Sequence, residues 1–172
     1  MSYTLKRIED IPPRALENFK WDDTEIVPYS FNYYWENGYE KYVANLKLME
    51  TDPPRPLVPS TDFFLMDGDN LVGIIDIRHR LNDGLKNYGG HIGYGVAPAY
   101  RGHSLAEKMV RMAAPFMREI GIEKVLICCD IENKASYRTI EKLGGVLENT
   151  LQVQRSGRMI TGCRFWVDLS AL

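Results

Sequence analysis

Cysteine is scarce in this sequence, with three residues in 172, and two of them are adjacent: Cys128, Cys129 and Cys163. An odd number of cysteines with this spacing is no disulfide framework, so we expect reduced thiols in the core. The three histidines lack the helical or cysteine-associated spacing of zinc ligands. The sequence therefore predicts no metal site and no disulfide.

The sequence also lacks an excess of charge and long apolar runs. Lysine and arginine total 21, aspartate and glutamate total 23, and the formal net charge is -2. This balance provides no field that would attract a nucleic acid or an anionic membrane. No stretch approaches the ~18 apolar residues of a membrane span, and residues 1–11 contain no apolar segment of a secretory signal. We expect a cytoplasmic protein with neither a membrane nor a nucleic-acid partner.

The composition is that of a globular chain. Hydrophobic residues make up 45% of the sequence and charged residues 26%, and 172 residues suffice for one domain with a real core. We expect a single domain over residues 1–172.

In the first half, apolar spacing predicts a strand, a short helix, a long amphipathic helix and a hairpin. The long helix carries aromatic residues at helical spacing, and Ser30 suits its N-cap. Asp67, Gly68, Asp69 and Asn70 form the expected hairpin turn. The predicted ranges are 3–8, 12–20, 30–50, 61–66 and 71–77.

In the second half, a glycine-rich strand, a helix and an apolar strand form a β-α-β crossover over 89–96, 102–120 and 125–129. Glycines within a strand are tolerated where it bulges or where a ligand approaches closely. A second helix over 133–143 and a hairpin of strands 145–154 and 159–169 complete the chain.

The start of the crossover helix is a candidate anion site. Residues 101–106 read Arg-Gly-His-Ser-Leu-Ala, where small side chains expose the backbone and the first helical N–H groups have no partner within the helix. The positive end of the helix dipole and the Arg101 guanidinium favour a phosphate here. Neither the dinucleotide nor the nucleoside triphosphate fingerprint is present.

The stretch IGYGVAPAYRGHSLA, residues 92–106, resembles the acetyl-CoA motif of the GNAT acetyltransferase superfamily, whose loop reads Arg/Gln-x-x-Gly-x-Gly/Ala. Ser104 stands where the family has its middle glycine, and Ala106 matches the last position. The resemblance implies a diphosphate site formed by Arg101, Gly102, His103, Ser104, Leu105 and Ala106. Downstream, the EKLGG helix exit at 141–145, with Asn133, Ser136 and Tyr137 before it, resembles the family's region beside the CoA arm.

Catalytic roles follow from this resemblance. The backbone N–H of Val96 is expected to bind the thioester oxygen, and Tyr137 to protonate the leaving sulfur. A thiolate with a pKa near ~8.5 needs only such a weak acid. His91 is the candidate base, because an unperturbed pKa near ~6.5 suits proton removal. Asp76, His79 or ordered water are alternatives.

The resemblance implies an α/β (α+β) fold: a mixed, mostly antiparallel central sheet flanked by helices, with the β-α-β crossover forming the acetyl-CoA site. We expect an N-acetyltransferase in which a primary amine, small molecule or peptide, attacks acetyl-CoA directly. A CoA-binding sensor module without catalysis is the alternative. The terminal hairpin offers an edge on which a homodimer could form.

Overall fold

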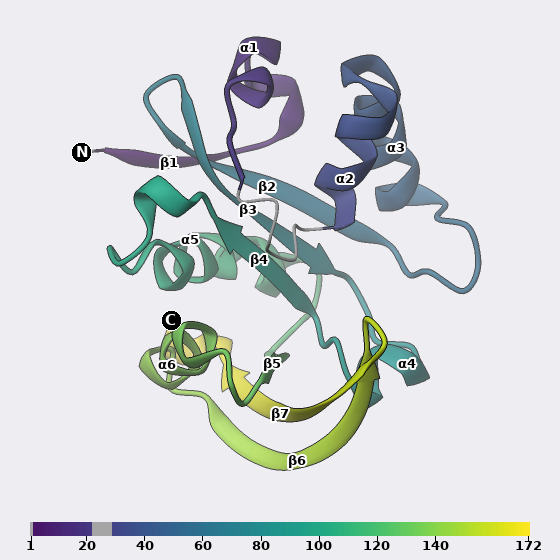
Figure 1. Cartoon of the computed structure of the whole chain (residues 1–172), viewed down its shortest axis with the longest axis vertical. Coiled ribbons are helices and arrows are strands. Elements are labelled where there is room, and N and C mark those ends of the chain that lie inside the picture. Colours follow the sequence, from purple (N-terminus) through teal and green to yellow (C-terminus); the bar gives the residue numbers. More distant parts are fainter. Residues whose placement is uncertain (1, 22–28) are drawn as a thin grey trace.

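The computed structural model describes residues 2–21 and 29–172, with side chains in the second range from residue 31 onward. Two sheets organise these residues (Figure 1). The first has the antiparallel order β1-β2-β3-β4, with bounds Tyr3–Lys6, Ser60–Asp67, Asn70–Arg78 and Ile92–Val96. The second has the antiparallel order β5-β7-β6, with bounds Lys124–Asp130, Arg158–Asp168 and Val146–Arg155.

Helices cover both faces of the first sheet. Aromatic and aliphatic side chains of α1, α2 and α3 pack with one face, and α5 packs on the other face, where it bridges to the second sheet (Figure 1). The helices are α1 Pro13–Glu17, α2 Tyr29–Asn37, α3 Tyr39–Thr51, α4 Asp83–Asn87, α5 Leu105–Glu119 and α6 Lys134–Lys142. The predicted mixed, mostly antiparallel architecture with flanking helices is confirmed.

Several elements differ from the prediction. The single helix expected over 30–50 is two helices, because Gly38 takes a φ of 80° between α2 and α3. Since α2 begins at Tyr29, Ser30 lies inside this helix and is not its N-cap; the Ser30 side chain is outside the described part. A short helix, α4, forms where a loop was expected, with the Asn82 side chain accepting from the Leu85 N–H at its start.

The strand and the helix of the crossover both begin later than predicted. Strand β4 starts at Ile92, because Gly89 and Gly90 have φ values of 138° and 68°. Helix α5 starts at Leu105, because Gly102 and Ser104 adopt positive φ of 81° and 55°. The residues that leave the helix in this way form the loop predicted to bind phosphate.

The two sheets separate between β4 and β5. Each is an edge strand of its own sheet, and the described residues join them through one bridge between Gly90 and Ile127. The strands are therefore held together at one end and separated beyond it.

Candidate active site

A cavity of about 640 Å³ occupies the division between the two sheets. Its walls are β4, the carboxyl end of β5, the first turn of α6 and the β6–β7 hairpin, and we call it the cleft. It is lined by both polar and apolar groups. The facing edges of β4 and β5 do not pair along the cleft, so their backbone N–H and C=O groups, as well as the side chains, can form hydrogen bonds with a ligand.

His91 lies at the point where the strands separate. Its backbone N–H donates to the Leu126 carbonyl over 2.8 Å, and its ring Nδ1 accepts the Leu126 N–H over 2.9 Å. The imidazole thus replaces the carbonyl that a paired strand would have provided. His91 is 8% exposed, and burial lowers its pKa to about 4, so the ring is neutral at pH 7. It does not line the cleft.

Val96 is the last residue of β4 and lies just beyond the residues that line the cleft. In an antiparallel ladder alternate residues of one strand bond to the same neighbour, and the Ala97 N–H donates to Val72 on β3. The N–H groups of Tyr94 and Val96 therefore point to the other side, where β5 lies without pairing. The role of the Val96 amide toward a thioester oxygen stays a prediction.

The loop before α5 has the geometry of an anion cradle. Within the described residues, 2–21 and 29–172, no backbone carbonyl accepts a hydrogen bond from the N–H groups of Gly102, His103 or Ser104. The Gly102 site is open, because a side chain there would meet nothing within 4 Å. Leu105 is 3% exposed and anchors the loop in the core, while Ala106, the second residue of α5, has a small side chain. His103 is exposed.

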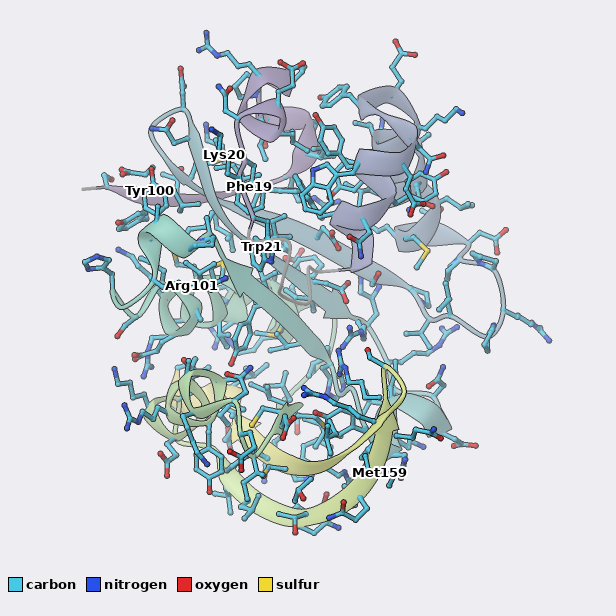
Figure 2. The ribbon with its side chains drawn as sticks, in the orientation of Figure 1. Phe19, Lys20, Trp21, Tyr100, Arg101 and Met159 are labelled. Carbon is cyan, nitrogen blue, oxygen red and sulfur yellow. The ribbon has the colours of Figure 1, made fainter. Side chains whose placement is uncertain are left out.

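Arg101, predicted to add charge to the loop, also holds the end of β4. Its Nε donates to the Val96 carbonyl over 3.0 Å, and its guanidinium lies 5.5 Å from the centre of the Trp21 ring. Figure 2 shows Arg101 and Trp21 approaching from separate segments at this end of β4. The side chain therefore links the strand exit to the loop after α1.

Ser104 brings a further positive charge to the loop. Its hydroxyl accepts a hydrogen bond of 3.0 Å from Nζ of Lys142, the last residue of α6. Lys142 is held near by Arg111, whose Nη2 donates to its carbonyl over 3.0 Å. A serine in place of the family's middle glycine thus recruits an ammonium group to the unpaired amides.

The first turn of α6 contributes two predicted residues to the cleft. Asn133 caps the helix by accepting the Ser136 N–H over 3.1 Å, and both residues line the cleft. The Ser136 hydroxyl lies 2.7 Å from the phenol of Tyr94, which also lines it. Burial raises the pKa of Tyr94 to about 12, so the phenol stays protonated.

Tyr137 lies differently from its neighbours on α6. Its ring packs edge-on against Phe165 with centroids 5.1 Å apart, and it belongs to the margin of the core instead of the cleft lining. Its role as the acid stays a prediction. The sequence did not indicate Tyr94 as a site residue, because alternation along β4 shows only which face of the strand carries its side chain. The Ser136 hydroxyl that it contacts lies 42 residues away in the sequence.

The alternative bases lie outside the cleft lining. Asp76 pairs with Nε of Arg78 at 3.1 Å. His79 Nε2 lies 2.8 Å from the Thr61 hydroxyl, and burial lowers its pKa. Cys128 and Cys129 both line the cleft, but burial raises the pKa of each thiol, to about 12 for Cys129, which disfavours a nucleophilic thiolate.

Three arginines at the cleft were not predicted from the sequence: Arg78, Arg155 and Arg158. They come from β3 and from both sides of the β6–β7 turn.

In the part of the chain that the structure describes, no three histidine, cysteine or acidic residues gather as metal ligands. None of the described helices is long and apolar enough to cross a membrane.

Known proteins share this fold and parts of this sequence. A chimera of the Vibrio cholerae spermidine N-acetyltransferase superposes with a TM-score of 0.67, covering 99% of this chain and 97% of its own, at 17% identity. A ribosomal-protein-S5-alanine acetyltransferase from Vibrio fischeri gives a TM-score of 0.66, covering 96% of this chain and 91% of its own, at 14% identity.

Sequence relatives are also acetyltransferases. Mycothiol acetyltransferase of Corynebacterium efficiens is 32% identical over 81 residues, which are 47% of this chain and 26% of that protein, so the matched segment spans about a quarter of the relative. N-alpha-acetyltransferase 30 of Schizosaccharomyces pombe is 22% identical over 69% of this chain and 81% of that protein. The acetyltransferase (GNAT) domain family matches residues 7–146, and this chain belongs to that family of acyltransferases.

Proposed function

We propose that this protein transfers the acetyl group of acetyl-CoA to a primary amine by direct attack. GNAT acetyltransferases use acetyl-CoA. The observation that carries the proposal is the cleft itself. Contacts of Gly90 and His91 hold the start of β4 against β5, and the two strands separate beyond this point. The separated edge of β4 has backbone N–H groups without a strand partner, and it ends at the loop before α5.

The residues of the loop fit the diphosphate of CoA. Open amides at Gly102 to Ser104, the N-terminus of α5 and the Lys142 ammonium all favour a dianion. From there the amide-containing arm would pass Val96, at the end of β4, and reach Asn133 in the cleft, and the polar groups of these two residues would orient it. Bound in this way, acetyl-CoA supplies the activated acyl group.

The Val96 N–H stabilises the oxyanion that develops when the amine attacks. Tyr94 and Ser136 lie deeper along the same walls and act as hydrogen-bond donors to the departing sulfur. A phenol with a pKa near 12 is too weak to transfer its proton fully to a thiolate near ~8.5, so its contribution is charge stabilisation. The proton that completes the thiol then comes from the nitrogen of the amine, which becomes positively charged when it forms the new C–N bond and gives up this second proton as the C–S bond breaks.

The amine loses its first proton to water. The His91 ring has a pKa near 4 and its Nδ1 is occupied by Leu126, so it is a poor general base for an ammonium near ~10.4. We infer that His91 positions the strands. The value of kcat/KM should then rise about tenfold per pH unit below the pKa of the amine.

Two measurements test the function. Titration calorimetry with acetyl-CoA should show saturable binding, and thiol release with a panel of amino acids, polyamines, amino sugars and peptides should show turnover with at least one class. Absence of acetyl-CoA binding would contradict the proposal. Binding without turnover for every amine would support the alternative of a CoA sensor.

A further inference from the structure

We propose that the acceptor amine carries a carboxylate or phosphate group, which Arg78, Arg155 and Arg158 bind at the end of the cleft remote from the diphosphate loop. This inference rests on the proposed function and concerns the acceptor half of the same site. The three guanidinium groups line one cavity although they come from two separate elements.

Arg155 and Arg158 face each other directly across the β6–β7 ladder. Only Ser156 and Gly157 separate them, with φ values of 49° and 78°, so the turn is tight and both side chains leave the same face. Like charges directly opposite on neighbouring strands destabilise a sheet. An anion held between the two groups would remove this repulsion and gain two charge-assisted hydrogen bonds.

The existing partners of these two arginines leave them available. Arg158 has a 4.0 Å ion pair with Asp130, and its side chain is 73% exposed. In residues 2–21 and 29–172, Arg155 forms no ion pair; its guanidinium lies 5.8 Å from the centre of the Tyr88 ring. A guanidinium stacked on a ring keeps its in-plane N–H groups for a carboxylate or phosphate.

Tyr88 is a fixed platform for this arrangement. A side chain at position 162 would overlap the Tyr88 ring, so the glycine of β7 allows the ring to lie directly on the strand. Burial raises the pKa of Tyr88 to about 12, which keeps it neutral beside the arginines. Arg155 is thereby held at the cleft by a ring that packs between the end of α4 and β7.

Arg78 supplies a third, more rigid group. Its Nη1 donates to the carbonyls of Gly89 and Gly90 over 3.0 and 3.2 Å, and its Nε pairs with Asp76. Its Nη2 lies over Gly93, where a side chain would come within 3.2 Å of it. The absence of a side chain at Gly93 leaves this nitrogen at the cleft surface.

The arginines lie at the opposite end of β4 from the diphosphate loop. Arg78 bonds through its N–H to the His91 carbonyl, just before β4 begins, whereas the loop follows the end of β4 at Val96. Figure 1 shows the β6–β7 turn beside α4, away from the start of α5. Figure 2 shows Met159, the neighbour of Arg158, far from Arg101. The CoA phosphates therefore do not explain the arginine cluster.

The charges of the cleft disfavour a polycation such as a polyamine. Its described acidic lining residues are Asp130 and Glu132, and Asp130 already accepts the Glu132 N–H over 3.1 Å and pairs with Arg158. A terminal ammonium would meet three guanidinium groups. An amine with an anionic tail would instead place its charge among the arginines and its amine toward Val96.

A matched series of amines tests the proposal. The compounds are 5-aminopentanoate, its neutral amide and 1,5-diaminopentane, with 3-aminopropyl phosphate to distinguish a phosphate from a carboxylate. For each, kcat/KM is measured by thiol release, and affinity by calorimetry in the presence of CoA. We expect at least tenfold preference for an anionic amine over the neutral and cationic ones.

Arginine variants assign the preference to the cluster. The changes Arg155→Gln and Arg158→Gln should each reduce the preference severalfold, and the double variant should abolish it. Arg14→Gln is the matched control, because Arg14 is an exposed residue of α1 paired with Asp69, and it should leave the preference intact. Thermal denaturation of each variant verifies folding.

The outcomes separate this inference from the proposed function. The proposal of an anionic acceptor would be overturned by any of four results. These are equal affinity for all the amines, a preference for the diamine, no binding of either anionic amine, and an intact preference in the double variant. Failure of acetyl-CoA to bind would overturn the proposed function, whereas binding of the anionic amines by the arginines is still measured by calorimetry, which does not depend on turnover.

Discussion

His91 shows how one side chain sets the shape of the cleft. Its Nδ1 replaces a strand carbonyl for Leu126, and protonation would turn that acceptor into a donor facing an N–H. The folded pKa near 4 lies below the unfolded value of ~6.5, so the unfolded state binds the proton first. Its contribution to stability is present above about pH 6.5 and is lost as pH falls toward 4.

The loss of stability at low pH can be tested by comparing the wild type with a variant at His91. In His91→Asn the amide oxygen still accepts the Leu126 N–H without titrating. The free energy of unfolding of the wild type should therefore fall by on the order of 2–3 kcal/mol more than that of the variant between pH 7 and pH 4. Urea denaturation at several pH values measures it. Parallel pH curves for the two proteins would show that His91 does not pin the strands.

Tyr94 and Tyr137 provide a second test on the residue scale. Tyr94→Phe removes the hydroxyl paired with Ser136 at the cleft, and we expect a drop of about tenfold to hundredfold in kcat with little change in the KM for acetyl-CoA. Tyr137→Phe keeps the ring against Phe165 and should have less than a threefold effect. Steady-state thiol release measures both, and the reverse ranking would restore Tyr137 as the acid.

On the scale of elements, the approach of β4 to β5 depends on Gly90. A side chain there would overlap the Leu126 carbonyl, and its φ of 68° is unfavourable for any other residue. Gly90→Ala should therefore cost about 2–4 kcal/mol of unfolding free energy by forcing the strands apart. Gly84→Ala in α4, where the new carbon meets only the Asn82 side chain at 3.4 Å, is the control and should be tolerated in the same denaturation experiment.

The contact between α6 and the loop before α5 predicts a change in cofactor affinity. Lys142→Gln removes the ammonium next to Ser104 and should raise the Kd for acetyl-CoA about threefold to tenfold at low salt. The difference should shrink as salt increases. Calorimetry at two ionic strengths measures it, with the exposed Lys124→Gln as control. A Kd equal to that of the wild type would remove Lys142 from the diphosphate site.

On the scale of the whole molecule, local signals predicted the order of elements better than the lining of the cleft. The turns at 67–70 and 155–158 and the loop at 101–106 are encoded by adjacent residues, so hairpins and crossover were predictable. The pairings of His91 with Leu126 and Tyr94 with Ser136 span 35 and 42 residues. No periodicity within one element indicates which side chains such distant segments bring together.

The two sheets meet along a cleft with little backbone pairing, so a ligand that spans the cleft should stabilise the whole molecule. At 100 times its Kd, acetyl-CoA should add about 2.7 kcal/mol of stability. For a chain of this size that raises Tm by roughly 5–10 °C. Pantetheine lacks the diphosphate and should give less than half this shift at the same concentration, because the amides at Gly102 to Ser104 remain unused. Thermal denaturation with each ligand measures the two shifts, and equal shifts would mean that the loop before α5 does not hold the phosphates.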